Sequence, residues 1–235
     1  MSGFTDIHSH FVYGIDDGAR SLDVMKAMLD AAYENNIRRL ISTPHSTPGV
    51  KPFPQELFEL HFSEAREYCA AMGYDIELLK GAEHLYTPAL PGYADNKGLR
   101  CLGDSRYVLV EFIPEADVEE IFYAVDFLSS RGYIPLIAHV ERYKKLSVKD
   151  ALKLKDEYNI IFQMNCDTVI EPKGFLLKQK VRKYLKTGLI SCIACDAHNC
   201  HSRPFNMLKA YESLNRDYGR AFADSLTALT EECVF

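Results

Sequence analysis

Short apolar segments recur along this sequence, and each of them ends in a histidine, an aspartate or a glutamate. The segments cover residues 4–10, 40–45, 78–83, 108–111, 136–139 and 190–196. Between them lie stretches with the apolar spacing of amphipathic helices, for example residues 22–36 and 55–72. Strands that alternate with helices pair in parallel through helical crossovers, so the sequence predicts an α/β fold with about seven strands.

The positions of the polar side chains decide between two α/β architectures. A doubly wound open sheet would place the carboxyl ends of its strands along a line. A closed β/α barrel gathers these ends into one ring. The expected strands are apolar at nearly every position, as strands covered on both faces should be. Because nearly every strand ends in a polar side chain, we favour the barrel.

The first segment carries the most specific pattern, with His8 and His10 separated by a single residue. Side chains alternate between the two faces of a strand, so both imidazoles point the same way. They could bind one metal ion, with Asp6 close enough to orient one of the rings. A pair of hydrogen-bonded surface histidines is the alternative for this motif alone. Asp196 and His198 repeat the spacing, which favours the metal site.

Composition and length exclude several classes of protein. No repeat or linker divides the 235 residues, so we expect a single domain over residues 1–235. The net charge of −6, without a basic stripe, argues against a nucleic-acid partner. The sequence has no apolar run of about 18 residues and no signal-peptide pattern at its N-terminus. We therefore expect no membrane insertion and a cytoplasmic location.

The seven cysteines are scattered along the chain. Cys192 and Cys195 have the C-x-x-C spacing, but inside an expected strand, where it places them on opposite faces. We interpret them as small core residues and the other thiols as reduced. No cysteine is followed by an arginine six positions later, which excludes a cysteine-dependent tyrosine phosphatase.

Histidines and carboxylates at the strand ends form a set of candidate metal ligands. The set is His8, His10, Asp17, His45, Glu83, Glu111, His139, Asp196 and His198. It is too large for one ion and suits two or three divalent ions that share bridging carboxylates. Mixed His and carboxylate ligands without thiolate are typical of manganese, iron or zinc. Such clustered ions bind phosphate oxygens and activate a water for attack, so the set predicts hydrolysis of a phosphate ester.

Some of these residues also fit simpler interpretations. Asp17 lies in an Asp-Asp-Gly turn signal, and His45 follows a Thr-Pro turn. Glu83 and Glu111 end apolar runs, where an unpaired carboxylate would be costly, and this favours metal binding. The proline-rich loop of residues 46–54 is long and follows His45, so we interpret it as a rim or lid of the site.

Three histidines are left out of the set. We expect His61, within a helix, and His201, beyond the last motif, at the surface. His84 adjoins Glu83 and should face the other way.

Two arginines stand next to candidate ligands. Arg142 follows His139 by three positions, and Arg203 follows His198 by five. A guanidinium binds phosphate through two parallel hydrogen bonds, so both are candidate substrate-binding residues. The alternative is a solvated arginine on a loop.

Together these motifs resemble the polymerase-and-histidinol-phosphatase (PHP) superfamily. The resemblance rests on Asp6-x-His8-x-His10, Asp16-Asp17-Gly18, Gly81-Ala82-Glu83, Glu111-Phe112, Ala138-His139-x-Glu141-Arg142-Tyr143 and Asp196-x-His198-Asn199. Within the superfamily, the string from His139 to Tyr143 and the later Ser202-Arg203-Pro204 are similar to the bacterial manganese-dependent protein-tyrosine phosphatases of capsule and exopolysaccharide clusters. The match covers almost the whole chain.

The resemblance implies a distorted seven-stranded β/α (TIM-like) barrel that holds three ions, most often Mn²⁺. The implied ligand sets are His8, His10, Glu83 and Asp196 for one ion, Glu83, Glu111 and His139 for a second, and Asp17, His45 and His198 for the third. Arg142 and Arg203 would bind phosphate and, with Asp17, take part in catalysis. The implied substrate is the tyrosine-phosphorylated tail of a membrane-associated tyrosine kinase that controls polysaccharide export.

Two other functions compete with this one. A small-molecule phosphatase, such as a histidinol-phosphate phosphatase, would share the metal set but needs a covered site, whereas a protein tail needs an open one. A non-catalytic, metal-stabilised binding module would lack ligands or both arginines, and none is missing.

Overall fold

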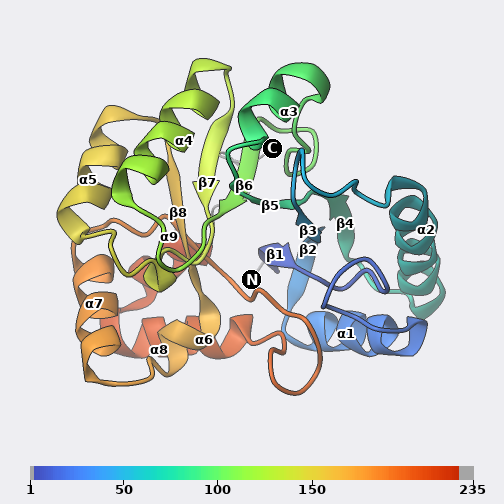
Figure 1. Ribbon diagram of the computed structural model, residues 1–235. Coiled ribbons are helices and arrows are strands. Elements are labelled where there is room, and N and C mark those ends of the chain that lie inside the picture. Colours follow the sequence, from blue (N-terminus) through green and yellow to red (C-terminus); the bar gives the residue numbers. More distant parts are fainter. Residues whose placement is uncertain (1–2, 228–235) are drawn as a thin grey trace.

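The computed structural model describes residues 3–227, and strands and helices alternate along them (Figure 1). The strands are β1 (Phe4–Ser9), β2 (Ile37–Ser42), β3 (His45–Ser46), β4 (Glu77–Lys80), β5 (Glu83–Leu85), β6 (Tyr107–Glu111), β7 (Ile134–Ile137), β8 (Ile161–Asn165) and β9 (Cys192–Ala194). The helices are α1 (Leu22–Glu34), α2 (Gln55–Met72), α3 (Leu90–Lys97), α4 (Val118–Ser130), the 3-10 helix η1 (Val140–Arg142), α5 (Val148–Glu157), α6 (Cys166–Ile170), α7 (Phe175–Lys186), α8 (Met207–Tyr218) and α9 (Arg220–Thr227). The α/β class expected from the sequence is confirmed.

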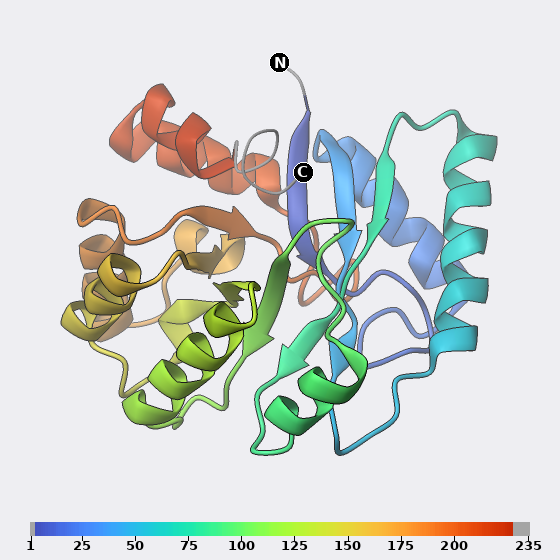
Figure 2. The same cartoon turned by 90° about the horizontal axis from the view of Figure 1, so that it is seen from above.

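The strands pair in parallel in the orders β1-β2-β4 and β3-β5-β6-β7-β8-β9. The two groups of strands are joined by a hydrogen bond. Glu83, at the start of β5, donates from its backbone N–H to Pro44 O, between β2 and β3, at 3.1 Å. A single parallel bridge joins Ser9, at the end of β1, to Ala197, beyond β9. The result is a curled parallel sheet with helices on its outer side (Figures 1 and 2).

Local signals in the sequence account for several helix ends. Ser21 caps α1 by accepting a hydrogen bond from Val24 N, and Ser147 forms a capping box with Asp150 at the start of α5. Helix α2 ends at Gly73, whose φ of 69° is the left-handed conformation that favours glycine. The sequence also predicts a last helix over residues 221–230; α9 covers residues 221–227 of it, and residues 228–230 lie outside the described part of the chain.

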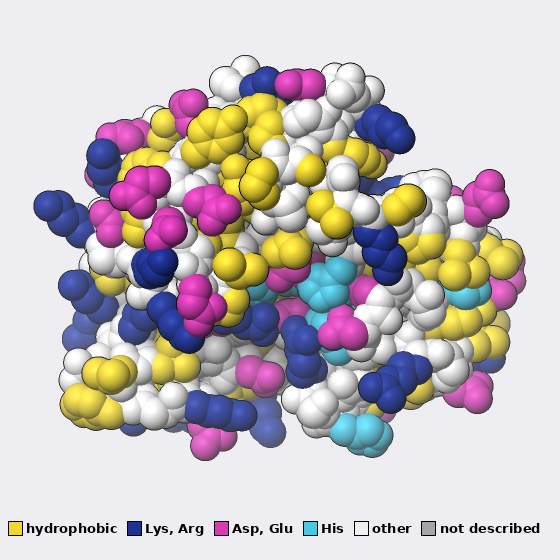
Figure 3. Space-filling view, in the orientation of Figure 1, with side chains coloured by type: hydrophobic (Ala, Val, Ile, Leu, Met, Phe, Trp, Pro, Cys, Tyr) yellow, Lys and Arg dark blue, Asp and Glu magenta, His cyan; other side chains and the backbone are white. Residues whose placement is uncertain are grey.

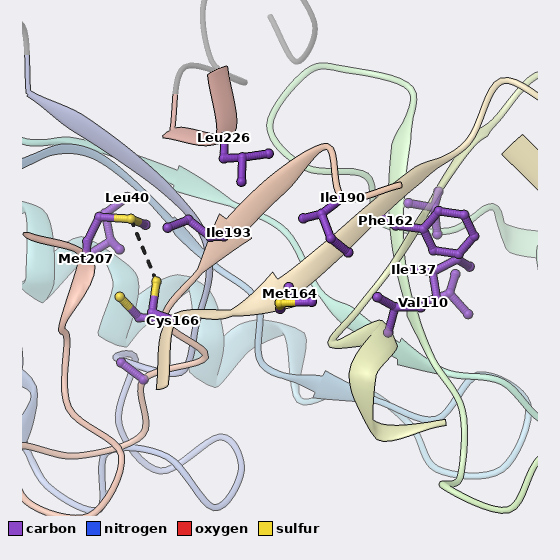
Figure 4. Packing of buried hydrophobic residues seen from close by; sticks show 14 of the residues in the cluster. Leu40, Val110, Ile137, Phe162, Met164, Cys166, Ile190, Ile193, Met207 and Leu226 are labelled. Carbon is purple, nitrogen blue, oxygen red and sulfur yellow. Dashed lines mark hydrogen bonds between the residues drawn. The ribbon is translucent and has the colours of Figure 1, made fainter. Parts of the chain in front are cut away.

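Apolar side chains cover both faces of the sheet. In β6, Val108 and Val110 belong to the large cluster under the helices, and Leu109 belongs to a smaller cluster on the other face. Figure 4 shows Val110, Ile137 and Phe162 of the large cluster next to one another, although they come from three strands. This two-sided burial explains why the strands read as nearly continuous apolar runs.

Cys192 and Cys195 are both buried and belong to different clusters, so they lie on opposite faces of the sheet as expected. The cysteines within residues 3–227 are all free thiols. In the same part of the chain, no helix combines the length and the apolar character needed to cross a bilayer.

Candidate metal centre

All nine candidate ligands lie together at the carboxyl end of the curled sheet. His8, His45, Glu83 and Glu111 belong to β1, β3, β5 and β6, and the other five lie in the segments that follow β1, β7 and β9. Figure 3 shows histidine and acidic side chains exposed together in the middle of this face. Strand ends far apart in the sequence therefore deliver their polar side chains to one place, as the parallel arrangement requires.

Glu83 is at the centre of the group. Its Oε2 lies 3.2 Å from His8 Nε2, 3.5 Å from His10 Nε2 and 3.0 Å from His45 Nδ1. Its Oε1 lies 2.9 Å from His139 Nε2. A fully buried carboxylate with four imidazoles around it is suited to bridge ions.

The other carboxylates complete three groups with ligand atoms close enough for one ion each. The groups are His8, His10 and Asp196; His45, Glu83 and Glu111; and His10, Asp17, His45 and His198, with the ligand atoms of each group within 4.8 Å of one another. Glu111 Oε2 also lies 3.7 Å from His139 Nε2. Asp17 Oδ1 lies 3.3 Å from His45 Nε2 and 3.4 Å from His198 Nε2.

Buried atoms without a hydrogen bond show that these side chains fit a metal. They include His8 Nε2, His10 Nε2, His45 Nδ1, Glu83 Oε2, Asp196 Oδ1 and His198 Nε2. Buried polar atoms are nearly always hydrogen-bonded, because leaving one unpaired costs about 1–3 kcal/mol. Six such atoms directed at one another are costly without a cation and favourable with one. The donor set, imidazole and carboxylate without thiolate, suits manganese, iron or zinc.

In the metal-free protein, the neighbouring carboxylates favour the protonated forms of His10 and His45. Burial disfavours the charged form of His10, but the carboxylates of Asp16, Asp196 and Glu83 around the ring outweigh it and hold the His10 pKa well above its usual value. Burial also opposes the charge on His45, but Glu111 and Glu83 raise its pKa to about 10. Metal binding must release such protons, so metal affinity is coupled to pH.

Several residues that the sequence analysis did not select hold the ligands in place. Asp16 Oδ2 accepts a hydrogen bond from His10 Nδ1 at 2.6 Å. Gln163 Oε1 lies 3.2 Å from His8 Nδ1 and accepts a hydrogen bond from the backbone N–H of His139 at 2.8 Å. Asn165 donates from Nδ2 to Asp196 at 2.9 Å. These contacts fix which ring nitrogens face the centre.

Asp6, expected to orient an imidazole, has a different role. Its Oδ1 accepts hydrogen bonds from the backbone N–H groups of His8 and Cys195, both at 3.2 Å. It therefore ties β1 to the segment after β9, and Asp16 and Gln163 orient the rings.

The two arginines lie at the edge of the centre and converge on one carboxylate. Arg142 and Arg203 each donate to Asp196 Oδ2, at 2.8 Å and 2.6 Å. Their side chains are 42% and 32% exposed, and Asp196 is buried. Two guanidinium groups that lie beside the ligands and are partly exposed to solvent are suited to bind an anion.

The three histidines left out of the set behave differently from one another. His201 is exposed and His84 turns away from Glu83 to bond Arg100 O at 3.0 Å, as expected. The surface position expected for His61 is wrong, because its ring is buried against Tyr13 with 3.6 Å between ring centroids. Its Nδ1 also lies 2.8 Å from Tyr13 O, so His61 supports the loop after β1.

Comparisons with known proteins agree with this geometry. The CpsB from Streptococcus pneumoniae, a tyrosine-protein phosphatase, is 33% identical over 228 residues, which cover 94% of this chain and 93% of that protein. The Bacillus subtilis tyrosine-protein phosphatase YwqE is 28% identical over 231 residues, which cover 96% and 89%. A solved structure of these metal-dependent tyrosine phosphatases superimposes with a TM-score of 0.86 at 26% identity and covers 95% of this chain and 91% of that one.

A second solved structure, histidinol phosphate phosphatase from Lactococcus lactis, matches with a TM-score of 0.58 at 12% identity, over 93% of this chain and 94% of that one, and shows a shared fold only. The model of the family described as capsular polysaccharide synthesis, CpsB/CapC, matches residues 4–235. The resemblance inferred from the motifs is confirmed, and the chain belongs to the CpsB/CapC family.

Proposed function

We propose that this protein is a metal-dependent protein-tyrosine phosphatase, a phosphoric monoester hydrolase that acts in capsular polysaccharide synthesis. The observation that carries the proposal is the convergence of nine histidines and carboxylates beside two arginines at one open edge of the sheet. The relatives named tyrosine-protein phosphatases, which align over most of this chain, support the same activity.

The cofactor in this proposal is a group of two or three divalent ions, most readily Mn²⁺. His8, His10, Glu83 and Asp196 would hold one ion, Glu83, Glu111 and His139 a second, and Asp17, His45 and His198 a third. Bound ions of this kind lower the pKa of water and neutralise the charge of the phosphate. The unpaired ligand atoms and the donor chemistry support the assignment.

The protein's own groups would bind and orient the substrate. The guanidinium groups of Arg142 and Arg203 can each donate two parallel N–H hydrogen bonds to phosphate oxygens. Their hydrogen bonds to Asp196 hold both groups in position before the phosphate arrives. Asp17, whose side chain is 67% exposed, lies on the solvent side of the cluster, where the phenolic part of the substrate would lie.

The open side of the centre favours a protein substrate over a small metabolite. His45 and Asp17 are both partly exposed, although His8, Glu83 and Asp196 beneath them are buried. A phosphotyrosine on a flexible tail can enter such a mouth, whereas a histidinol-phosphate phosphatase needs a covered pocket. We therefore favour a phosphotyrosine-bearing protein tail, such as that of a bacterial tyrosine kinase, as the partner. The cytoplasmic location stays a prediction.

For the architecture, we propose one domain over the whole chain, built on a distorted seven-stranded barrel. If β2 with β3 and β4 with β5 are each counted as one interrupted strand, the curled sheet has seven members. The bridge from Ser9 to Ala197 and the hydrogen bond from Asp196 N to His8 O at 2.9 Å support closure between the first and the last of them.

A parallel assay tests the activity. The purified protein, with its metal content measured, is given a phosphotyrosyl peptide and histidinol phosphate under the same conditions. We expect hydrolysis of the peptide, loss of that activity in His139→Ala with the circular dichroism spectrum unchanged, and retention of it in the exposed control His201→Ala. Preference for histidinol phosphate would favour the metabolite phosphatase, and full activity of His139→Ala would refute the proposed centre.

A further inference from the structure

Helix α7 presents two large apolar side chains to solvent at its first turn. Phe175 is 73% exposed and Leu176 is 80% exposed, the highest values among the exposed large hydrophobic residues of the part of the chain described. The opposite side of the helix is packed against the protein through Val181, Tyr184 and Leu185. Single exposed apolar residues are ordinary, but two adjacent ones exposed to this degree indicate a contact surface.

The same helix is strongly basic in an acidic protein. Residues 173–186 contain six of the 27 lysines and arginines and no aspartate or glutamate, although the whole chain has a net charge of −6. Lys178, Arg182, Lys183 and Lys186 are exposed, and none of them belongs to an ion pair within residues 3–227. Their charges are therefore available to an anionic partner.

Helical geometry places these two features on one face. At 100° per residue, Phe175, Arg182 and Lys186 lie within about 40° of one another, and Leu176 and Lys183 lie next to them. Figure 3 shows basic and hydrophobic side chains side by side on the lower left, the region that α7 occupies in Figure 1. The helix therefore has an apolar tip, Phe175 and Leu176, followed by a basic face.

We propose that this face of α7 binds the surface of an anionic membrane. Phe175 and Leu176 would enter the region between lipid headgroups, and the lysines and Arg182 would lie against lipid phosphates. Phe175 and Leu176 lie in the first turn of the helix and are mostly exposed, so they are free to enter the surface of a bilayer. An anionic bilayer offers both the negative charge and the apolar layer that this face complements.

The position of α7 connects this surface to the metal centre. Lys180, on the inner side of the helix, donates from Nζ to Glu141 O at 3.1 Å and to Tyr143 O at 2.7 Å. These two carbonyls flank Arg142, one of the two arginines suited to bind an anion. Binding of α7 would thus hold the phosphatase site at a fixed distance from the membrane, within reach of tails attached to that membrane.

Co-sedimentation with lipid vesicles tests the proposal and needs no catalytic activity. We expect the full-length protein to bind vesicles of phosphatidylcholine with 30% phosphatidylglycerol, to bind pure phosphatidylcholine much less, and to lose binding as salt is raised. The variant Lys183→Gln/Lys186→Gln should bind more weakly by about fivefold for each cation, or about 25-fold in all. The matched control Arg106→Gln/Lys209→Gln removes the same charge from exposed sites elsewhere and should bind as the unaltered protein does.

A second pair of variants tests the apolar tip. Phe175→Ser/Leu176→Ser should lose vesicle binding and keep full activity on a free phosphotyrosyl peptide, while Leu60→Ser/Met72→Ser, at exposed sites on α2, should keep both. Equal loss in the α7 variants and their controls, or absence of binding to anionic vesicles, would overturn the proposal. So would self-association in sedimentation experiments, or binding to an acidic peptide without vesicle binding, because these outcomes would assign the face to a second copy or to a protein.

Discussion

Replacement of Asp16 by asparagine should weaken metal binding without unfolding the protein. Asp16 Oδ2 accepts hydrogen bonds from His10 Nδ1 at 2.6 Å and from His45 N at 2.8 Å, and Oδ1 accepts one from Gly18 N at 2.9 Å. Asparagine offers one oxygen in place of two and turns an N–H group toward one of these donors. Asp16→Asn therefore loses either the contacts with His10 and His45 or the one with Gly18, and the loop that carries Asp16 is less firmly held.

The expected size of the effect follows from what Asp16 holds. Loss of one partner that orients a metal-ligating imidazole typically costs about 10–100-fold in metal affinity or activity. This corresponds to about 1.4–2.7 kcal/mol. Because Asp16 contacts the ring of His10 and the backbone of His45, two candidate ligands, we expect the upper part of this range.

Calorimetric titration of the metal-stripped protein with Mn²⁺ measures this affinity directly, and activity on a phosphotyrosyl peptide as a function of Mn²⁺ concentration gives an independent value. Asp23→Asn removes a carboxylate from the exposed first turn of α1 and serves as the control. If Asp16→Asn binds Mn²⁺ as tightly as the unaltered protein does, and its circular dichroism spectrum is unchanged, the orienting role of Asp16 is refuted.

Three further outcomes follow from the site and the core. A chelator should abolish phosphatase activity and added Mn²⁺ should restore it; activity that persists in a sample shown to be free of metal would contradict the proposed centre. Arg203→Lys replaces a planar, two-pronged donor by a single ammonium, so kcat/KM for the phosphotyrosyl peptide should fall about 10–100-fold, and an unchanged value would place Arg203 outside the substrate site. Phe162→Ala removes a fully buried ring between the sheet and its helices. The free energy of unfolding, measured by urea denaturation, should fall by about 3–5 kcal/mol. A change below about 1 kcal/mol would show that this part of the core is loosely packed.

Much of the fold could be predicted because strand and helix signals agree along this chain. Apolar strands, the caps Ser21 and Ser147 and the stop at Gly73 all fall where the pattern places them. Helix α4 also begins directly after Asp117, as the capping-box pattern of Asp117 and Glu120 predicts, but Asp117 makes no capping hydrogen bond and its carboxylate pairs with Lys145 instead. A contact between residues 28 positions apart is invisible to a local pattern.

The limits of prediction at the site have a similar cause. Charged ligands at strand ends leave a mark in the sequence, because an unpaired carboxylate at the end of an apolar run is unfavourable. The residues that orient these ligands have no such pattern in the sequence around them. Gln163 is a neutral residue within β8, and nothing in its neighbourhood in the sequence connects it to His8 or His139. Asp16 and Asp17 are adjacent in the same turn. Only the backbone conformation of this turn decides that Asp16 contacts His10 and that Asp17 contacts His45 and His198.

The backbone at two candidate ligands shows a constraint that local sequence patterns cannot reveal. His139 has φ 32° and Asp196 has φ 52°, a left-handed conformation that costs a residue with a side chain about 1–2 kcal/mol. Each lies two residues beyond the end of its strand, β7 or β9, and the conformation is held by neighbouring strands: Gln163 accepts from His139 N at 2.8 Å, and Asp196 N donates to His8 O at 2.9 Å. Glycine would suit both positions better but carries no ligand. The chain therefore keeps a histidine and an aspartate where the backbone favours glycine, which is expected where chemistry and not folding selects the residue.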